Sequence, residues 1–176
     1  MNQKPTSTNP ASTAVRTFSA EDLSALSEQA TAAARRRTHL NVHASADANV
    51  QRLFIATEPD SYMRPHRHPE EHKWEFFVVL RGRLDLLVFE DTGELRQRIA
   101  LSPDATPAVE IAPRTFHAYV CMQPGTVALE IKEGAYIPTP EHEFAPWAPP
   151  ERSEGAPAYL AWMRSAAPPA RSPGAR

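Results

Sequence analysis

The chain has 176 residues but only one cysteine, Cys121, so it cannot form an intramolecular disulfide. A single thiol is compatible with a reducing compartment. Residues 1–18 lack the apolar stretch of a signal peptide, and no apolar run approaches the roughly 20 residues of a membrane-spanning helix. We therefore expect a soluble, cytoplasmic protein with no membrane partner.

A dominant charge of one sign is also missing. Nineteen Lys and Arg residues face 21 Asp and Glu residues, and the formal net charge of −2 gives no general attraction to nucleic acid. The one basic cluster, Arg35-Arg36-Arg37, fits favourable charge at the end of a helix better than a phosphate-binding or nucleic-acid patch. We expect a small-molecule ligand and no nucleic-acid partner.

Proline, in contrast, is abundant, with 18 residues, many of them near the ends of the chain. The length predicts one domain with tails. Residues 1–18 are rich in Thr, Ser, Asn and Pro and are predicted to be a disordered tail. Residues 19–140 are predicted to form the domain, and residues 141–176 a Pro-rich C-terminal arm whose last ten or so residues are disordered.

Helical patterns occur only near the ends of the domain. Ser19 and Asp22 resemble a capping box, Leu23 and Leu26 begin an apolar stripe, and the arginine cluster is expected to close this helix. A second, short helix is predicted in the arm at residues 156–165.

The residues between these helices alternate between apolar and polar types. Strands are predicted at residues 39–43, 50–57, 74–80, 83–90, 94–101, 108–111, 115–122 and 127–133. Many short strands with turn signals and no intervening helix are typical of an all-β sandwich or barrel.

His66 and His68 form a pair of possible metal ligands. Side chains two apart in an extended segment point to the same side, so both imidazoles face one point. Imidazole nitrogen suits Zn, Fe, Ni and Cu and tolerates Mn. The pair alone is weak evidence, because surface histidine pairs are common.

Glu75 strengthens the interpretation because it shares a strand face with Phe77 and Val79. An inward carboxylate is costly unless it is paired or binds a cation. The alternative is that Glu75 lies at a frayed strand start in water. The strand is apolar on both faces, which requires a second packed layer or a subunit contact.

His117 follows a turn at Pro113 and shares its strand face with Tyr119 and Cys121. A single histidine of this kind is more often hydrogen-bonded than metal-bound. Together the four residues predict a site for one divalent metal ion (Fe, Mn, Ni or Zn), with the ligands His66, His68, Glu75 and His117.

These motifs resemble those of the cupin superfamily. The first motif corresponds to His66, His68, Glu75 and Gly82, and the second to Pro113 and His117. Two features depart from the usual pattern: six residues separate His68 from Glu75, which leaves Glu70 or Glu71 as a substitute ligand, and Arg114 stands where a glycine is common. The resemblance implies an all-β fold, a double-stranded antiparallel β-barrel (jelly roll), here with an N-terminal helix and a Pro-rich C-terminal arm.

The match is closer to one subgroup, the WbuC-family cupin-fold metalloproteins. The resembling stretches span most of residues 36–140 and include residues 37–43, 50–52, 61–68, 73–80, 89–93, 109–113 and 130–134. The longer spacing between His68 and Glu75 is normal in this subgroup. The resemblance implies a metal-binding, RmlC-like fold and an association with surface polysaccharide biosynthesis, but no defined reaction.

A pocket is expected around the ion. Glu75 and Tyr119 are predicted catalytic groups that move a proton. The predicted substrate pocket comprises Asn41, His43, Arg52, Tyr62, Arg64 and Glu130. For Asn41 and His43 a structural role is equally compatible, and Glu130 could simply pair with Lys132.

The leading functional prediction is a metal-dependent enzyme, isomerase-like or epimerase-like, that acts on a small polar substrate such as a sugar or sugar derivative. One alternative is an Fe(II) oxygenase of a small acid, and another is a non-catalytic cupin that binds or senses a small molecule. A third, a metal-free epimerase, would need a His–Asp pair, for which Asp60 and Asp85 are the nearby acids. Exposed apolar strand faces and the long arm predict a homodimer.

Overall fold

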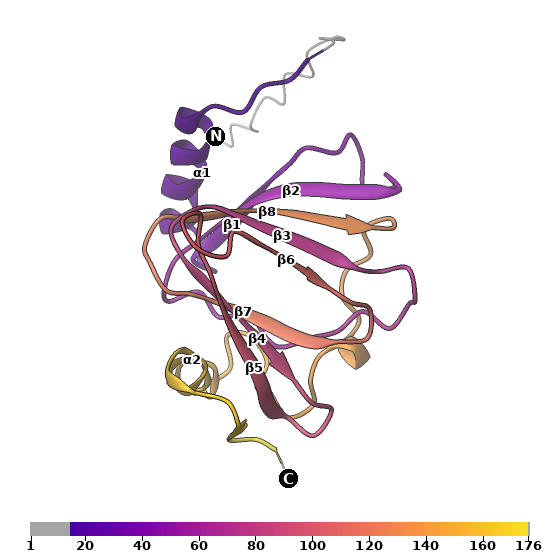
Figure 1. Cartoon of the computed structure of the whole chain (residues 1–176), viewed down its shortest axis with the longest axis vertical. Coiled ribbons are helices and arrows are strands. Elements are labelled where there is room, and N and C mark those ends of the chain that lie inside the picture. Colours follow the sequence, from indigo (N-terminus) through magenta and orange to yellow (C-terminus); the bar gives the residue numbers. More distant parts are fainter. Residues whose placement is uncertain (1–14, 176) are drawn as a thin grey trace, which may run out of the picture.

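The computed structural model describes residues 15–175 and consists of two antiparallel sheets packed face to face (Figure 1). Helix α1 lies beside the first sheet, and helix α2 of the C-terminal arm lies against the second (Figure 1). The elements are α1 (Ala20–Ala32), β1 (Arg37–Asn41), β2 (Val50–Thr57), β3 (Glu75–Arg81), β4 (Leu84–Phe89), β5 (Glu94–Leu101), β6 (Ala108–Ile111), β7 (Phe116–Cys121), β8 (Thr126–Glu133), a 3-10 turn η1 (Glu141–Glu143), α2 (Ala156–Ser165) and β9 (Ala170–Arg171).

The strand order identifies the fold. The first sheet runs β1-β2-β8-β3-β6 and the second runs β7-β4-β5-β9. The segment at His66 joins the free edge of β7 through a β-bridge to His117. One layer therefore has the order β2-β8-β3-β6, and the facing layer consists of the His66 segment, β7, β4 and β5. This arrangement of eight strands is that of a jelly roll. The predicted fold class is therefore confirmed.

The space between the sheets has an apolar end and a polar end. At the apolar end, Ile55 and Val79 both lie opposite Ala128 of β8 and pack against residues of the second sheet. At the other end the same inner face of β8 carries Glu130 and Lys132. Directly opposite residues share a face of an antiparallel pair, so the polar side chains gather at one mouth of the barrel.

Helix α1 begins as predicted. Ser19 and Asp22 form a reciprocal capping box, and Leu26 packs against Phe54 of β2. The helix ends at Ala32, before the arginine cluster, so the expectation that the arginines close it is wrong. Arg36 adopts a left-handed φ of 55°, which turns the chain into β1 at the next residue.

The predicted N-terminal tail is only partly described. Residues 1–14 lie outside the described residues. Within residues 15–18, Phe18 packs on Phe54 with ring centroids 4.9 Å apart, and Arg16 donates to the carbonyl oxygen of Val42. This short segment is thus attached to the barrel.

The C-terminal arm builds a second apolar core on the outer face of the second sheet. Helix α2 has the predicted bounds, and it buries Tyr159 and Met163 against that sheet together with Trp147. The segment after it, predicted to be disordered, instead contains β9, which pairs with Glu94 and Leu95 of β5. A hydrogen bond of 2.7 Å between the hydroxyls of Tyr159 and Ser172 fastens this segment to α2, a contact that composition alone does not reveal.

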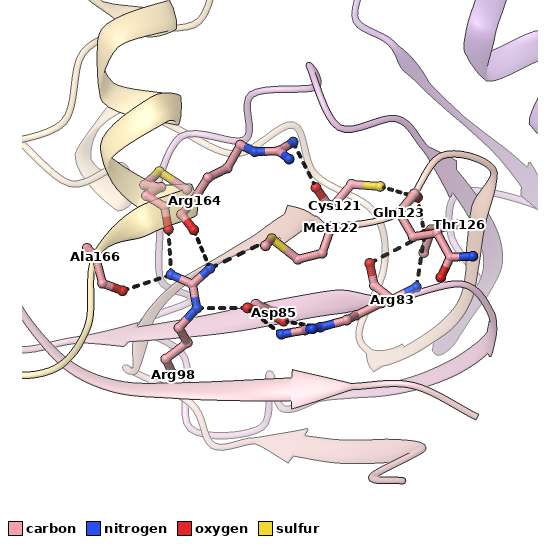
Figure 2. Close-up of polar contacts among 10 residues, drawn as sticks. Arg83, Asp85, Arg98, Cys121, Met122, Gln123, Thr126, Arg164 and Ala166 are labelled. Atoms are coloured by element: carbon pink, nitrogen blue, oxygen red, sulfur yellow. Dashed lines mark hydrogen bonds and ion pairs between the residues drawn. The ribbon is translucent and has the colours of Figure 1, made fainter. Parts of the chain in front are cut away.

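A buried ion pair anchors the end of α2 (Figure 2). The Nε of Arg98 donates to the buried carboxylate of Asp85 at 2.7 Å. The remaining guanidinium nitrogens of Arg98 donate to the main-chain carbonyls of Met163, Arg164 and Ala166, each at 2.8 Å. These carbonyls close the last turn of α2, where intrahelical partners are lacking, so Arg98 caps the helix and holds it on the barrel.

Candidate metal centre

Three predicted ligands converge at the polar mouth. One ligand atom each from His66, Glu75 and His117 all lie within 4.8 Å of one another. Paired main-chain hydrogen bonds of 3.0 and 2.9 Å place His66 beside His117, at the free edge of β7. Glu75 is the first residue of β3, in the facing sheet.

Glu75 does not lie in water. It is only 3% exposed, so the alternative of a frayed strand start is wrong. Its two oxygens face two imidazoles: Oε2 lies 2.8 Å from Nε2 of His117, and Oε1 lies 3.3 Å from Nε2 of His68. His68 therefore adjoins the cluster through Glu75, although it is outside the tightest group of three.

The other ring nitrogen of each histidine contacts a hydrogen-bond acceptor. Nδ1 of His66 lies 3.2 Å from the carbonyl oxygen of Arg64, and Nδ1 of His117 lies 2.9 Å from that of Thr115. Nδ1 of His68 lies 2.9 Å from a carboxylate oxygen of Glu143. These partners can only accept, so each Nδ1 carries the hydrogen of the neutral ring.

That tautomer leaves the Nε2 lone pairs of His68 and His117 facing the oxygens of Glu75, and it leaves Nε2 of His66 free to bind a cation. Nε2 of His68 and Oε2 of Glu75 are buried and have no hydrogen-bond partner among the described residues. Lone pairs that face a carboxylate without a hydrogen between them need a cation. The donor set, imidazole nitrogens fixed through their outer nitrogens plus one carboxylate, fits a divalent transition metal.

The electrostatic environment favours the protonation states that a metal ion requires at His66 and Glu75, but it opposes the neutral ring at His68. Burial, reinforced by His117, lowers the pKa of His66 to about 3, so its ring stays neutral. Burial raises the pKa of Glu75, but His117, His68 and Lys132 outweigh it and hold that pKa well below its ordinary value. Burial lowers the pKa of His68, but Glu75 and Glu143 outweigh it, and the net shift is upward.

Glu143 is a site residue that the sequence did not reveal. It lies in η1 of the Pro-rich arm and is 4% exposed. The arm runs alongside the histidine segment: the main-chain N–H of Arg67 donates to the carbonyl oxygen of Glu143, and that of Ala145 donates to Pro65. A Pro-rich segment has no periodicity that would have placed this carboxylate beside His68.

The two alternative carboxylates do not join the site. Glu70 pairs with Lys73 at 2.7 Å, and Glu71 pairs with Arg114 at 3.0 Å. Glu75 is therefore the carboxylate of the cluster, and the longer spacing after His68 is accommodated by the intervening turn.

A pocket of about 180 Å³ opens onto the cluster. Its lining residues are Arg35, Arg37, Met63, Arg64, His66, Glu75, Phe77, His117, Glu130, Lys132, Thr139, Phe144 and Glu151. Of the predicted substrate-pocket residues, Arg64 and Glu130 belong to this lining. Lys132, which lies directly opposite Glu75 in the β3–β8 pair, was not predicted to face substrate.

Asn41 and His43 line a separate hollow of about 290 Å³. Glu130 and Lys132 line both spaces and lie between them. The ring of His43 is fixed by its Nδ1, which lies 3.0 Å from the main-chain nitrogen and 2.9 Å from the main-chain oxygen of Arg52. His43 therefore has a structural role as well as a place in this hollow.

Three predicted site residues lie elsewhere. Arg52 is exposed on the outer face of β2, because the alternation that turns Leu53 inward turns Arg52 outward. Tyr62 is buried in the arm's core, where its hydroxyl donates to the carbonyl oxygen of Pro149. Tyr119 lies one inward position beyond His117 on β7, within the apolar core and outside the pocket lining. Burial raises the pKa of Tyr119, which disfavours proton transfer by its hydroxyl.

The structure also argues against a His–Asp dyad. Asp60 pairs with Arg36 at the surface, at 2.9 Å. Asp85 is held by Arg83 and Arg98 (Figure 2). Neither aspartate contacts a histidine of the cluster.

Comparison with known proteins yields one family and several distant structures. The family described as a domain of unknown function (DUF6016) matches residues 18–101, somewhat less than half of the chain. A search of the curated proteins finds no match. No helix among residues 15–175 is long and apolar enough to cross a membrane.

The similar solved structures are cupins and proteins of related fold. A cupin 2 domain-containing protein from Halorhodospira halophila is 16% identical over 58% of this chain and 68% of its own, with a TM-score of 0.46. KdgF from Halomonas sp. is 16% identical over 57% and 82%, with a TM-score of 0.45. L-ribose isomerase from Cellulomonas parahominis is 14% identical over 58% and 62%, with a TM-score of 0.47. The chain's own strand order makes it a jelly roll of the cupin type; these distant likenesses add nothing about its activity.

Proposed function

We propose that this protein is a metal-dependent cupin enzyme that binds one divalent ion through His66, His68, Glu75 and His117. The observation that carries the proposal is the arrangement of the three imidazoles around Glu75. Each has its Nδ1 beside an acceptor. Nε2 of His68 and Nε2 of His117 each face an oxygen of Glu75, and a ring nitrogen of His66 lies within 4.8 Å of ligand atoms of Glu75 and His117. Such outer partners fix the tautomer of metal-binding histidines.

The proposed substrate is a small polar molecule such as a sugar or sugar derivative. The pocket of about 180 Å³ is smaller than the roughly 300–1,000 Å³ of sites for drug-sized ligands, and its wall is mainly polar. When bound, the ion would polarise a carbonyl or hydroxyl oxygen of the substrate. Glu75, the buried carboxylate beside it, is the group proposed to hold or move a proton.

We propose an isomerase or epimerase reaction, linked to surface polysaccharide biosynthesis through the resemblance to WbuC-family cupins. An Fe(II) oxygenase acting on a small acid uses the same ligands and is the second candidate. The cationic residues of the pocket wall are the feature that favours an acid as its substrate.

The test is a turnover assay on protein loaded separately with Mn, Ni, Zn or Fe(II). A panel of aldoses, ketoses and sugar acids is followed by proton NMR, and oxygen consumption is followed in parallel for the iron form. Interconversion of a sugar that requires metal supports the isomerase, whereas metal-dependent oxygen uptake supports the oxygenase. Binding without turnover in every metal form contradicts both and leaves a sensing or binding cupin.

A further inference from the structure

The pocket beside the metal centre carries more positive than negative side chains. Its cations are Arg35, Arg37, Arg64 and Lys132, and its carboxylates are Glu75, Glu130 and Glu151. The wall therefore has an excess of one positive charge, which a divalent ion raises to three. A concave site lined by an excess of one sign concentrates ligands of the opposite sign.

Lys132 is a cation that contacts the carboxylate of the cluster. Its Nζ lies 3.7 Å from Oε1 of Glu75 and 2.8 Å from Oε1 of Glu130. The position is set by the register of the sheet, which pairs Lys132 directly with Glu75 across β3 and β8. An oxygen of a ligand bound on this side of the ion would therefore lie within reach of the ammonium group.

The arginines have a different arrangement. Arg35 and Arg37 share the carboxylate of Glu151, which belongs to the C-terminal arm, whereas the two carboxylates beside Lys132 belong to the sheet and one of them is Glu75 of the cluster. Arg64 donates to the carbonyls of Ala148 and Ala145 and pairs with an exposed glutamate of the arm. The arginines therefore mainly hold the C-terminal arm and set the field, whereas Lys132 lies beside the cluster itself.

We propose that the ligand of this pocket carries a carboxylate next to a hydroxyl or carbonyl oxygen, as in a 2-hydroxy acid, a 2-oxo acid or a sugar acid, and that Lys132 binds this carboxylate. This inference rests on the proposed metal site and specifies its substrate class. The neighbouring oxygens would bind an ion held at the site, while the ammonium group of Lys132 would neutralise the acid. A charge-assisted contact of this kind in a partly buried pocket is worth about tenfold or more in affinity.

The test compares glycerate with glycerol, which has the same carbon skeleton without the carboxylate. Isothermal titration of the zinc-loaded protein is expected to show glycerate binding at least about tenfold tighter than glycerol. Inorganic phosphate is titrated as a third probe. Equal affinity for glycerate and glycerol, or a preference for phosphate over glycerate, overturns the proposal.

Lys132→Met should affect the affinity for glycerate and the affinity for zinc differently. Removing a positive charge near the ion is expected to leave zinc affinity unchanged or higher, while glycerate affinity falls about tenfold or more. General loss of structure would lower both. Lys132→Arg should retain glycerate binding, and Arg96→Met, which changes an arginine 69% exposed on β5, should alter neither affinity.

The two proposals fail in distinguishable ways. Absence of zinc binding in the wild type removes the metal site and this inference with it. Zinc binding with unchanged glycerate affinity in Lys132→Met contradicts the inference alone.

Discussion

Glu143→Gln offers a sharp test of how the metal centre is held. The carboxylate accepts from Nδ1 of His68 at 2.9 Å and is 4% exposed. The amide has the same shape but carries no charge, so it holds the ring less firmly and makes Nε2 less basic. Loss of such an outer partner costs about 10–100-fold in metal affinity, or about 1.4–2.7 kcal/mol.

The assay is a zinc titration against a chromophoric chelator at alkaline pH, because the raised pKa of His68 would otherwise let protons compete with zinc for its ring. Thermal unfolding of the metal-free variant is measured alongside, because a general loss of packing would lower stability as well as affinity. The arm provides a matched control: Glu141 lies in the same 3-10 turn, but its side chain is 80% exposed and pairs with Arg64. Glu141→Gln should change zinc affinity by less than about threefold, because Glu141 itself is exposed and Arg64 keeps its hydrogen bonds to the carbonyls of Ala145 and Ala148.

Two outcomes would refute this reasoning. Zinc affinity of Glu143→Gln equal to that of the wild type would mean that the contact with His68 has no bearing on metal binding. Equal losses in Glu143→Gln and Glu141→Gln would mean that the arm acts through its overall charge or packing.

Three further predictions concern stability and assembly. The free energy of unfolding of the metal-free protein should fall as pH falls from about 6.5 to about 3, because His66 of the unfolded state binds a proton that the folded state excludes. This group contributes up to about 1.4 kcal/mol per pH unit. Denaturant unfolding of His66→Gln should show a free energy of unfolding that depends less steeply on pH. Arg98→Met should lower the free energy of unfolding by about 3 kcal/mol, because it removes the more buried of the two arginines that pair with buried Asp85 together with the hydrogen bonds that cap α2, and zinc affinity should not change; a loss below about 1 kcal/mol in urea unfolding would contradict this. We also propose a homodimer whose contact includes the exposed Tyr136 and Ile137, so light scattering should give twice the chain mass, and Ile137→Asp should give the monomer mass.

Local patterns predicted much of the barrel. Three strands, at residues 50–57, 94–101 and 108–111, have the predicted bounds, and the others differ by one or two residues. The inward face of Glu75 was also predicted, because alternation along a strand fixes which residues share a face. His66 and His117 belong to two separate motifs, and their convergence was predictable because both motifs were expected to face one lumen.

Contacts between segments distant in sequence were not predictable in this way. Lys132 reaches Glu75 only because β8 pairs with β3, and no periodicity specifies that register. Glu143 reaches His68 because the arm folds back along the histidine segment. The same folding back buries Tyr62 under the arm, which removes it from the predicted pocket.

The central claim is that the chain binds a metal ion with the four predicted residues. Elemental mass spectrometry of the purified wild-type protein, beside His66→Ala/His117→Ala, tests it most directly. We expect close to one divalent ion per chain in the wild type and almost none in the double variant, with both proteins folded by circular dichroism. A wild-type protein that holds no metal, even after incubation with a panel of divalent ions, would contradict it.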